Sequence, residues 1–206
     1  GEVVPIRQVV FNAMAKIESA AKTKGTVTGI PTGFLDLDRR TAGLQPSDLI
    51  LIAARPSMGK TAFVLNIAQH VAFKQNMAVA IFSLEMSKEQ LAQRIISTEA
   101  RIISNKLRTG DISDSDWEKL GLALQNLVNC ELYFDDQANI NVNEMKARAL
   151  RMKNVDCIVI DYLQLMSGTK RTENRVNEVS EITRGLKMMA KDLNIPVVTC
   201  SQLSRG

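Results

Sequence analysis

The stretch Ala54-Arg55-Pro56-Ser57-Met58-Gly59-Lys60-Thr61 decides the fold of this chain. A strand-like run at 48–53 leads into it, and the helix-permissive run 62–68 follows. A strand, a tight loop, Gly-Lys-Thr and a helix, in this order, form the arrangement that binds a nucleoside triphosphate. Backbone N–H groups of such a loop and the helix N-terminus point at the phosphates. The usual first glycine is Ala54 here, which is small but less free to adopt φ > 0.

The chemistry of this loop assigns roles to its last residues. The Lys60 ammonium would neutralise phosphate oxygens, and the Thr61 hydroxyl would bind Mg²⁺. The predicted cofactors are therefore ATP and Mg²⁺. The residues expected to contact the nucleotide are Ser57, Met58, Gly59, Lys60, Thr61 and Ala62.

The composition is that of one soluble globular domain. The chain has 206 residues, of which 45% are hydrophobic and 23% charged. Its formal net charge of +4 permits a nucleic-acid partner without requiring one. No apolar run approaches the roughly 18 residues of a membrane-spanning helix, and no export signal opens the chain. Three widely spaced cysteines, each in or beside an apolar segment, suit buried and reduced thiols, so we expect a cytoplasmic protein with no membrane contact.

Strand and helix patterns alternate along most of the chain. Short apolar runs predict strands at 48–53, 78–83, 131–134, 157–160 and 195–200. Helical spacing predicts helices at 6–22, from about 62, 87–101, 113–128, 142–153 and 176–193. This order indicates an α/β fold with a mainly parallel central sheet and helices on both faces. Ligands of such sheets bind at the carboxyl ends of the strands.

Two carboxylates follow predicted strands at that edge. Asp161 closes the run 157–160 and is suited to the Mg²⁺ shell opposite Thr61, or alternatively caps the next helix. Glu85 follows the run 78–83, expected beside the P-loop strand, where a carboxylate could deprotonate the attacking water. The alternative for Glu85 is a residue in the first turn of a helix, favoured by the helix dipole.

An amide and a basic loop complete this predicted edge. Gln202 follows the strand at 195–200 and could sense the γ-phosphate, which gives it a catalytic role beside Glu85 and Lys60. The polar segment 165–175 contains Lys170, Arg171 and Arg175, which suit contacts with a phosphate backbone. An ordinary solvated loop explains this segment equally well.

The helix at 6–22 precedes the nucleotide fold and carries an apolar stripe. Two interpretations remain open from the residues alone. The stripe packs on its own domain, or it docks on a neighbouring subunit.

Taken together, these residues resemble the C-terminal motor domain of DnaB-type replicative DNA helicases, a branch of the RecA-like P-loop ATPases. The motifs that carry the resemblance are residues 53–61, Phe82-Ser83-Leu84-Glu85-Met86-Ser87, Ile160-Asp161-Tyr162-Leu163-Gln164-Leu165, residues 177–187, and Ser201-Gln202-Leu203-Ser204-Arg205. The resemblance implies a linker helix at 1–25 that docks on the next subunit and a RecA-like ATPase domain at 26–206. It also implies a hexameric ring around single-stranded DNA, with ATP hydrolysed between subunits, and primase and a helicase loader as partners.

The resemblance further implies that the motor domain continues beyond Gly206, with a cationic finger donated to the neighbour's ATP and another DNA-contacting loop. We therefore expect a fragment that hydrolyses ATP poorly by itself. Two other classes share the P-loop chemistry: a RecA-like strand-exchange or repair protein, and a small-molecule kinase. The kinase would need an acceptor pocket and an Arg-rich lid, and the sequence offers no candidate lid.

Overall fold

The computed structural model describes residues 2–22, 28–54, 59–163 and 172–202. Its centre is a five-stranded sheet in the order β1-β5-β4-β2-β3, and every pairing between these strands is parallel. The strands are β1 Leu49–Ala54, β2 Val79–Ser83, β3 Leu132–Asp135, β4 Cys157–Leu163 and β5 Val197–Gln202. The predicted α/β fold with a parallel sheet is confirmed.

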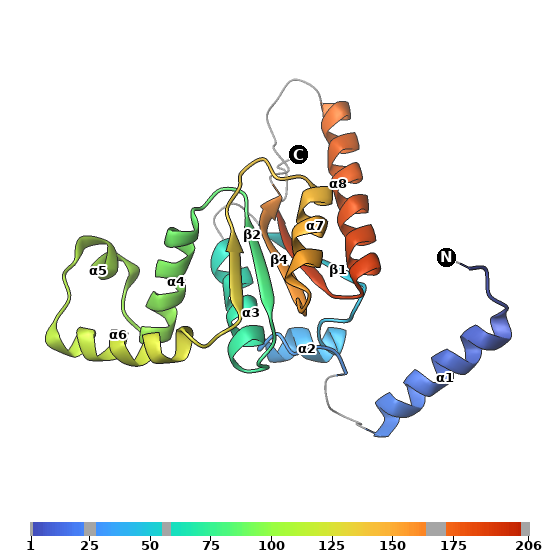
Figure 1. Cartoon of the computed structure of the whole chain (residues 1–206), viewed down its shortest axis with the longest axis horizontal. Helices are drawn as coiled ribbons and strands as arrows, with labels where there is room; N and C mark the ends of the chain where they lie inside the picture. Colours follow the sequence, from blue (N-terminus) through green and yellow to red (C-terminus); the bar gives the residue numbers. More distant parts are fainter. Residues whose placement is uncertain (1, 23–27, 55–58, 164–171, 203–206) are drawn as a thin grey trace.

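The helices between the strands cover both faces of the sheet (Figure 1). The helices of the described residues are α1 Ile6–Lys22, α2 Leu35–Thr41, α3 Lys60–Phe73, α4 Lys88–Ala100, α5 Ser104–Thr109, α6 Asp114–Leu127, α7 Val142–Met152 and α8 Thr172–Leu193. All the longer helices expected from the sequence are present. The short α2 and α5, of seven and six residues, were not predicted because they hold fewer than two full turns of apolar spacing.

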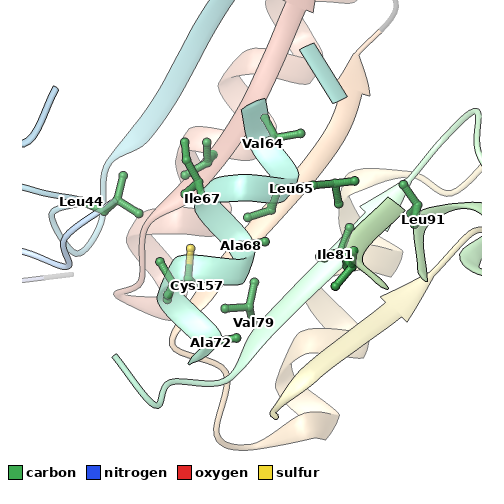
Figure 2. Close-up of a cluster of buried hydrophobic side chains, with 14 of the residues drawn as sticks. Leu44, Val64, Leu65, Ile67, Ala68, Ala72, Val79, Ile81, Leu91 and Cys157 are labelled. Atoms are coloured by element: carbon green, nitrogen blue, oxygen red, sulfur yellow. The ribbon is translucent and has the colours of Figure 1, made fainter. Parts of the chain in front are cut away.

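Successive residues of each strand face opposite layers, since strand side chains alternate between the two faces. Val79 and Ile81 of β2 pack with α3 in one buried cluster (Figure 2), whereas Ala80 and Phe82 pack with α7 and α8 in another. All five residues of β2 are buried. A strand covered on both faces reads as a continuous apolar run, which explains why the sequence identified it.

The order of the strands corrects one expectation. β1, which leads to the P-loop, pairs with β5, and β5 and β4 separate it from β2. The carboxylate after β2 is therefore not on a strand beside β1. Helix α3 crosses from β1 over β5 and packs against Cys157 and Val159 of β4, and the charge of Glu85 acts on Asp161 of the same strand β4.

Helix α1 stands away from the sheet and its covering helices (Figure 1). Every residue of α1 is exposed, including the large apolar side chains of Ile6, Val10, Phe11 and Met14. The interpretation in which its apolar stripe packs on its own domain is therefore wrong for this structure. The stripe remains uncovered.

The three cysteines are free. Cys157 and Cys200 are buried, and burial raises their thiol pKa values to about 12 and about 11. Cys130 is also a free thiol but is only half-buried, so the expectation that all three thiols are buried is wrong for this residue. No helix in the described part of the chain is both long and apolar enough to cross a membrane.

Candidate nucleotide site

The site begins where α3 begins. Gly59 precedes this helix with φ of +61°, in the left-handed region that glycine adopts without steric cost. Its carbonyl accepts a hydrogen bond from the Phe63 N–H at 3.0 Å, which closes the first turn. Lys60 is the first helical residue and is only 9% exposed. The first N–H groups of a helix have no acceptor within the helix, so this end of α3 suits the binding of an anion such as phosphate.

Thr61 and Asp161 meet directly, although 100 residues separate them. The Thr61 hydroxyl donates to a carboxylate oxygen of Asp161 at 3.2 Å. Asp161 is 1% exposed and lies within β4, whereas the helix that follows begins only at Thr172. Asp161 therefore does not cap that helix, which removes the alternative explanation for this residue.

The surroundings of Asp161 shift its protonation. Burial raises the pKa of the Asp161 carboxyl above its ordinary value, and the charge of Glu85 adds to this effect. The Thr61 hydrogen bond and the charges of Arg94 and Lys60 lower the pKa in opposition. Desolvation is the largest of these causes. A hydroxyl and a carboxylate side by side form the hard oxygen set that suits Mg²⁺ shared with nucleotide phosphates.

Within the described residues, no group of three or more histidine, cysteine or acidic side chains could hold a metal alone. Mg²⁺ that binds together with a nucleotide usually needs only one or two protein groups, because the substrate phosphates supply further ligands. The chain offers Thr61 and Asp161 for that purpose.

Glu85 lies in the turn between β2 and α4, two residues beyond the end of the strand. Helix α4 begins at Lys88 with Ser87 as its N-cap, and the acidic residue of its first turn is Glu89. Glu85 is therefore outside the helix, contrary to the alternative in which the helix dipole explains it. Its charge acts on Asp161, so the two carboxylates belong to one site.

Gln202 is the last residue of β5 rather than the residue after it. Its Cα is paired with that of Ala54, the last residue of β1. The main chain thus brings Gln202 to the end of the strand that enters the P-loop. This register follows from the β1–β5 pairing, which the sequence alone does not specify.

The remaining predicted residues are placed less fully. Ala62 is exposed in the first turn of α3. Ser57, Met58, Lys170 and Arg171 lie outside the described residues. Arg175 belongs to the first turn of α8.

Two neighbours of the site were missed from the sequence. Arg94 on α4 interacts with the Asp161 charge, and the Cys200 thiol donates to the Lys60 carbonyl at 3.7 Å beneath the start of α3. No motif marks either residue. The only available signal was that Arg94 lies within the helix expected at 87–101, close in sequence to Glu85.

A parallel sheet, a left-handed glycine before a helix that starts with Lys-Thr, and an acidic residue on the third strand of the sheet define a P-loop nucleotide-binding domain of the RecA-like class. Comparison with known proteins identifies the family. The family model described as "DnaB-like helicase C terminal domain" matches residues 29–206, and this chain belongs to that family.

Relatives of known sequence agree. The chain is 51% identical over 205 residues to the replicative DNA helicase DnaC of Bacillus subtilis (strain 168). It is 50% identical over 205 residues to the replicative DNA helicase DnaB of Geobacillus stearothermophilus. Each alignment covers 98% of this chain and 45% of the relative, so the chain spans about half the length of these proteins.

Solved structures agree as well. A structure described as an ATPase domain superposes with a TM-score of 0.86 at 37% identity, over 99% of this chain and 73% of that one. A DnaB-like replicative helicase, described with its interactions with primase, gives a TM-score of 0.82 at 37% identity, over 99% of this chain and 49% of that one. The RadB recombinase, at 19% identity and a TM-score of 0.51, shows only the shared fold.

Proposed function

We propose that this chain is the motor of a replicative DNA helicase, which hydrolyses Mg-ATP to move along single-stranded DNA and unwind the duplex. The observation that carries the proposal is the meeting of Thr61, Asp161 and the Glu85 turn in a chain of the DnaB-like family. A fold alone does not define a function, because proteins with RecA-like sheets have several different functions. The site chemistry and the family together favour this one.

In the proposed reaction, Lys60 neutralises phosphate oxygens and the N-terminus of α3 donates N–H groups to them. Thr61 and Asp161 would hold Mg²⁺, which when bound offsets the negative charge on the phosphates. Glu85 orients the attacking water and takes up its proton. Gln202 senses the γ-phosphate from the end of β5.

The apolar surfaces that a single chain leaves exposed support the proposal that several copies of the chain assemble. The apolar face of α1 would dock on a neighbouring subunit, with residues 1–25 acting as a linker and 26–206 as the ATPase domain. A suitable receptor is the outer face of α6, where Trp117, Leu124 and Val128 are exposed at helical spacing. Head-to-tail docking of this kind forms a ring when the rotation between subunits closes, and we propose a closed hexamer.

The ring would act on DNA in the cytoplasm. Lys170, Arg171 and Arg175 are the proposed contacts to the DNA backbone, because basic side chains there bind phosphates without reading sequence. Primase and a helicase loader are the proposed protein partners. One structurally similar helicase is described with its primase interactions.

The first test is Glu85→Gln in the full-length protein. ATP binding should survive, since the nucleotide contacts of α3 are unchanged, and hydrolysis should fall by well over about tenfold. The matched control is Glu89→Gln, which removes a carboxylate four residues later on the exposed first turn of α4. Equal losses of binding and hydrolysis in Glu85→Gln would argue for a structural role.

The second test concerns the substrate. Strand displacement on a forked duplex, driven by ATP, is the expected activity of the full-length protein. ATP-driven pairing of homologous strands without unwinding would refute the helicase proposal. ATP turnover that DNA does not stimulate, but a nucleoside or sugar does, would favour a kinase instead.

A further inference from the structure

The turn that carries Glu85 is held by hydrogen bonds on both sides of that residue. The Leu84 N–H donates to the Asp161 carbonyl at 2.9 Å, and the Met86 N–H donates to the Ser83 hydroxyl oxygen at 3.1 Å. Further along, the Lys88 N–H donates to a carboxylate oxygen of Asp136 at 3.0 Å. The residues before and after Glu85 are therefore fixed to β4 and to β2.

Among these partners Ser83 uses a side chain buried beneath the site. Ser83 is 1% exposed, is the last residue of β2, and is paired with Asp161 across the β2–β4 ladder. Paired residues of parallel strands present their side chains on the same face, so Ser83 lies on the α3 face beside Asp161. The preceding residues on that face, Val79 and Ile81, are aliphatic.

A hydroxyl that is buried among aliphatic side chains destabilises the fold unless it is hydrogen-bonded. Leaving a buried N–H without its acceptor costs about 1–3 kcal/mol, and the hydrogen bond from the Met86 N–H is partly buried, so its loss costs at most about that much. With alanine at position 83, the Met86 N–H would lose the Ser83 oxygen, and the turn would relax by rotating toward another acceptor or toward water. Glu85 sits between the two tethered residues, so its carboxylate would move with the turn.

We propose that Ser83 is a positioning residue that fixes the Glu85 turn for catalysis. Its hydroxyl oxygen holds the Met86 N–H, while the Asp161 carbonyl holds the Leu84 N–H from the other side. Because Asp161 also accepts from Thr61, the same strand end ties the turn to the metal-binding side of the site. This inference rests on the proposed role of Glu85 as the residue that orients water.

The experiment is Ser83→Ala in the full-length protein, with steady-state ATP turnover and nucleotide affinity measured together. A displacement of about 1 Å at a catalytic group can cost on the order of 10²-fold in rate. We expect kcat to fall about 10- to 100-fold, while KM and ADP affinity change less than about threefold. A kcat within about twofold of the parent protein would overturn the proposal.

A double-mutant cycle separates positioning from general damage. If Ser83 acts through Glu85, then Ser83→Ala should lower kcat by less than about twofold in a Glu85→Gln background. Independent, multiplicative losses would contradict the proposal. An unimpaired Glu85→Gln protein would instead refute the role of Glu85 itself, so the two failures are distinguishable.

Two further variants control for folding. Thr199→Val removes another buried strand hydroxyl, which donates to the Ile160 carbonyl at 3.1 Å and has no bond to the turn. It should lower thermal stability as Ser83→Ala does while leaving kcat within about twofold. Ser83→Thr keeps the acceptor oxygen and should retain most of kcat; a folded Thr variant with unchanged ADP affinity and a loss equal to that of alanine would count against the proposal.

Discussion

Asp161 joins two parts of the proposed site through two different groups. Its side chain accepts from the Thr61 hydroxyl, and its main-chain carbonyl accepts from the Leu84 N–H beside Glu85. Burial makes its ionised form costly, as the raised pKa indicates. A residue kept at that cost is typical of a functional site.

The first prediction concerns Asp161→Asn. A folded-state pKa above the unfolded value means that the carboxyl favours folding when protonated and loses that contribution as pH rises through the folded pKa. Asparagine removes the buried charge and can still accept from Thr61. We therefore expect the nucleotide-free protein to gain about 0.5–2 kcal/mol in unfolding free energy at neutral pH.

The same variant should lose metal-dependent binding, by about 10- to 100-fold in the affinity for Mg²⁺ with nucleotide. Thermal unfolding and calorimetric titration, each across pH, measure the two effects. The difference in unfolding free energy between the Asp161→Asn variant and the parent protein should shrink at acidic pH, because Asp161 of the parent protein becomes protonated there. A destabilised Asn variant would show that ionised Asp161 supports the fold.

The second prediction concerns Lys60→Ala. Hydrogen bonds to charged groups contribute about 1.5–3 kcal/mol, so nucleotide affinity should fall about 10- to 150-fold and turnover should be abolished. The fold should survive because Lys60 lies at a helix end. Fluorescent nucleotide binding measures the affinity, and Lys74→Ala, at the exposed far end of α3, is the matched control. Unchanged turnover in Lys60→Ala would refute the assignment.

At the scale of elements, the strands were predictable because a parallel sheet covered on both faces leaves uninterrupted apolar runs such as 78–83. Ser87 and Ser113 cap α4 and α6, and each accepts a hydrogen bond from the backbone N–H three residues on, which is a signal that adjacent sequence carries. Both signals depend only on residues that are close in sequence, so the sequence alone is enough to detect them.

The strand order and its consequences were not predictable in the same way. The pairing of β1 with β5 joins residues that are about 150 positions apart, and the sequence of neither strand specifies which strand it pairs with. The predicted position of Glu85, on a strand beside β1, was therefore wrong, and the hydrogen bond from the Met86 N–H to the Ser83 hydroxyl was not predicted. The site residues were recognised by type and by their place after strands, whereas their contacts depend on tertiary packing.

The third prediction tests α1. The double variant Val10→Glu and Met14→Glu places charges on the exposed apolar stripe. If two such side chains are buried on association, each contributing at least about 1.5 kcal/mol, the dissociation constant should rise about 100-fold. Light scattering or native mass measurement with Mg-ATP reports the assembly.

Gln8→Glu with Asn12→Glu is the matched control, since helical spacing places both on the opposite side of α1. It should assemble normally. Leu124→Glu on α6 should reproduce the defect if that helix is the receptor. Normal assembly of the α1 stripe variant would remove α1 from the interface.

At the scale of the whole molecule, the proposed site and the uncovered helix α1 lie in different places. The site lies at the carboxyl edge of the sheet, and the chain leaves α1 uncovered rather than folding it over that edge (Figure 1). Exposed apolar surface of this extent on a separate helix indicates an interaction site. If a neighbouring subunit supplies a cationic group to the ATP, as the resemblance to the helicase family implies, then hydrolysis should depend on assembly more strongly than nucleotide binding does.

The fourth prediction follows from that difference. Dilution of the full-length protein below its assembly threshold should leave nucleotide affinity within about threefold of its assembled value, since Lys60, Thr61 and Asp161 belong to one chain. Specific ATP turnover should fall by about 10³-fold or more, the contribution expected of a cationic finger supplied by a neighbour. The Val10→Glu, Met14→Glu protein should show the low turnover even when concentrated, and added single-stranded DNA should not restore it. Turnover that is independent of concentration, in a protein shown by mass measurement to be monomeric, would mean that the chain completes its own active site.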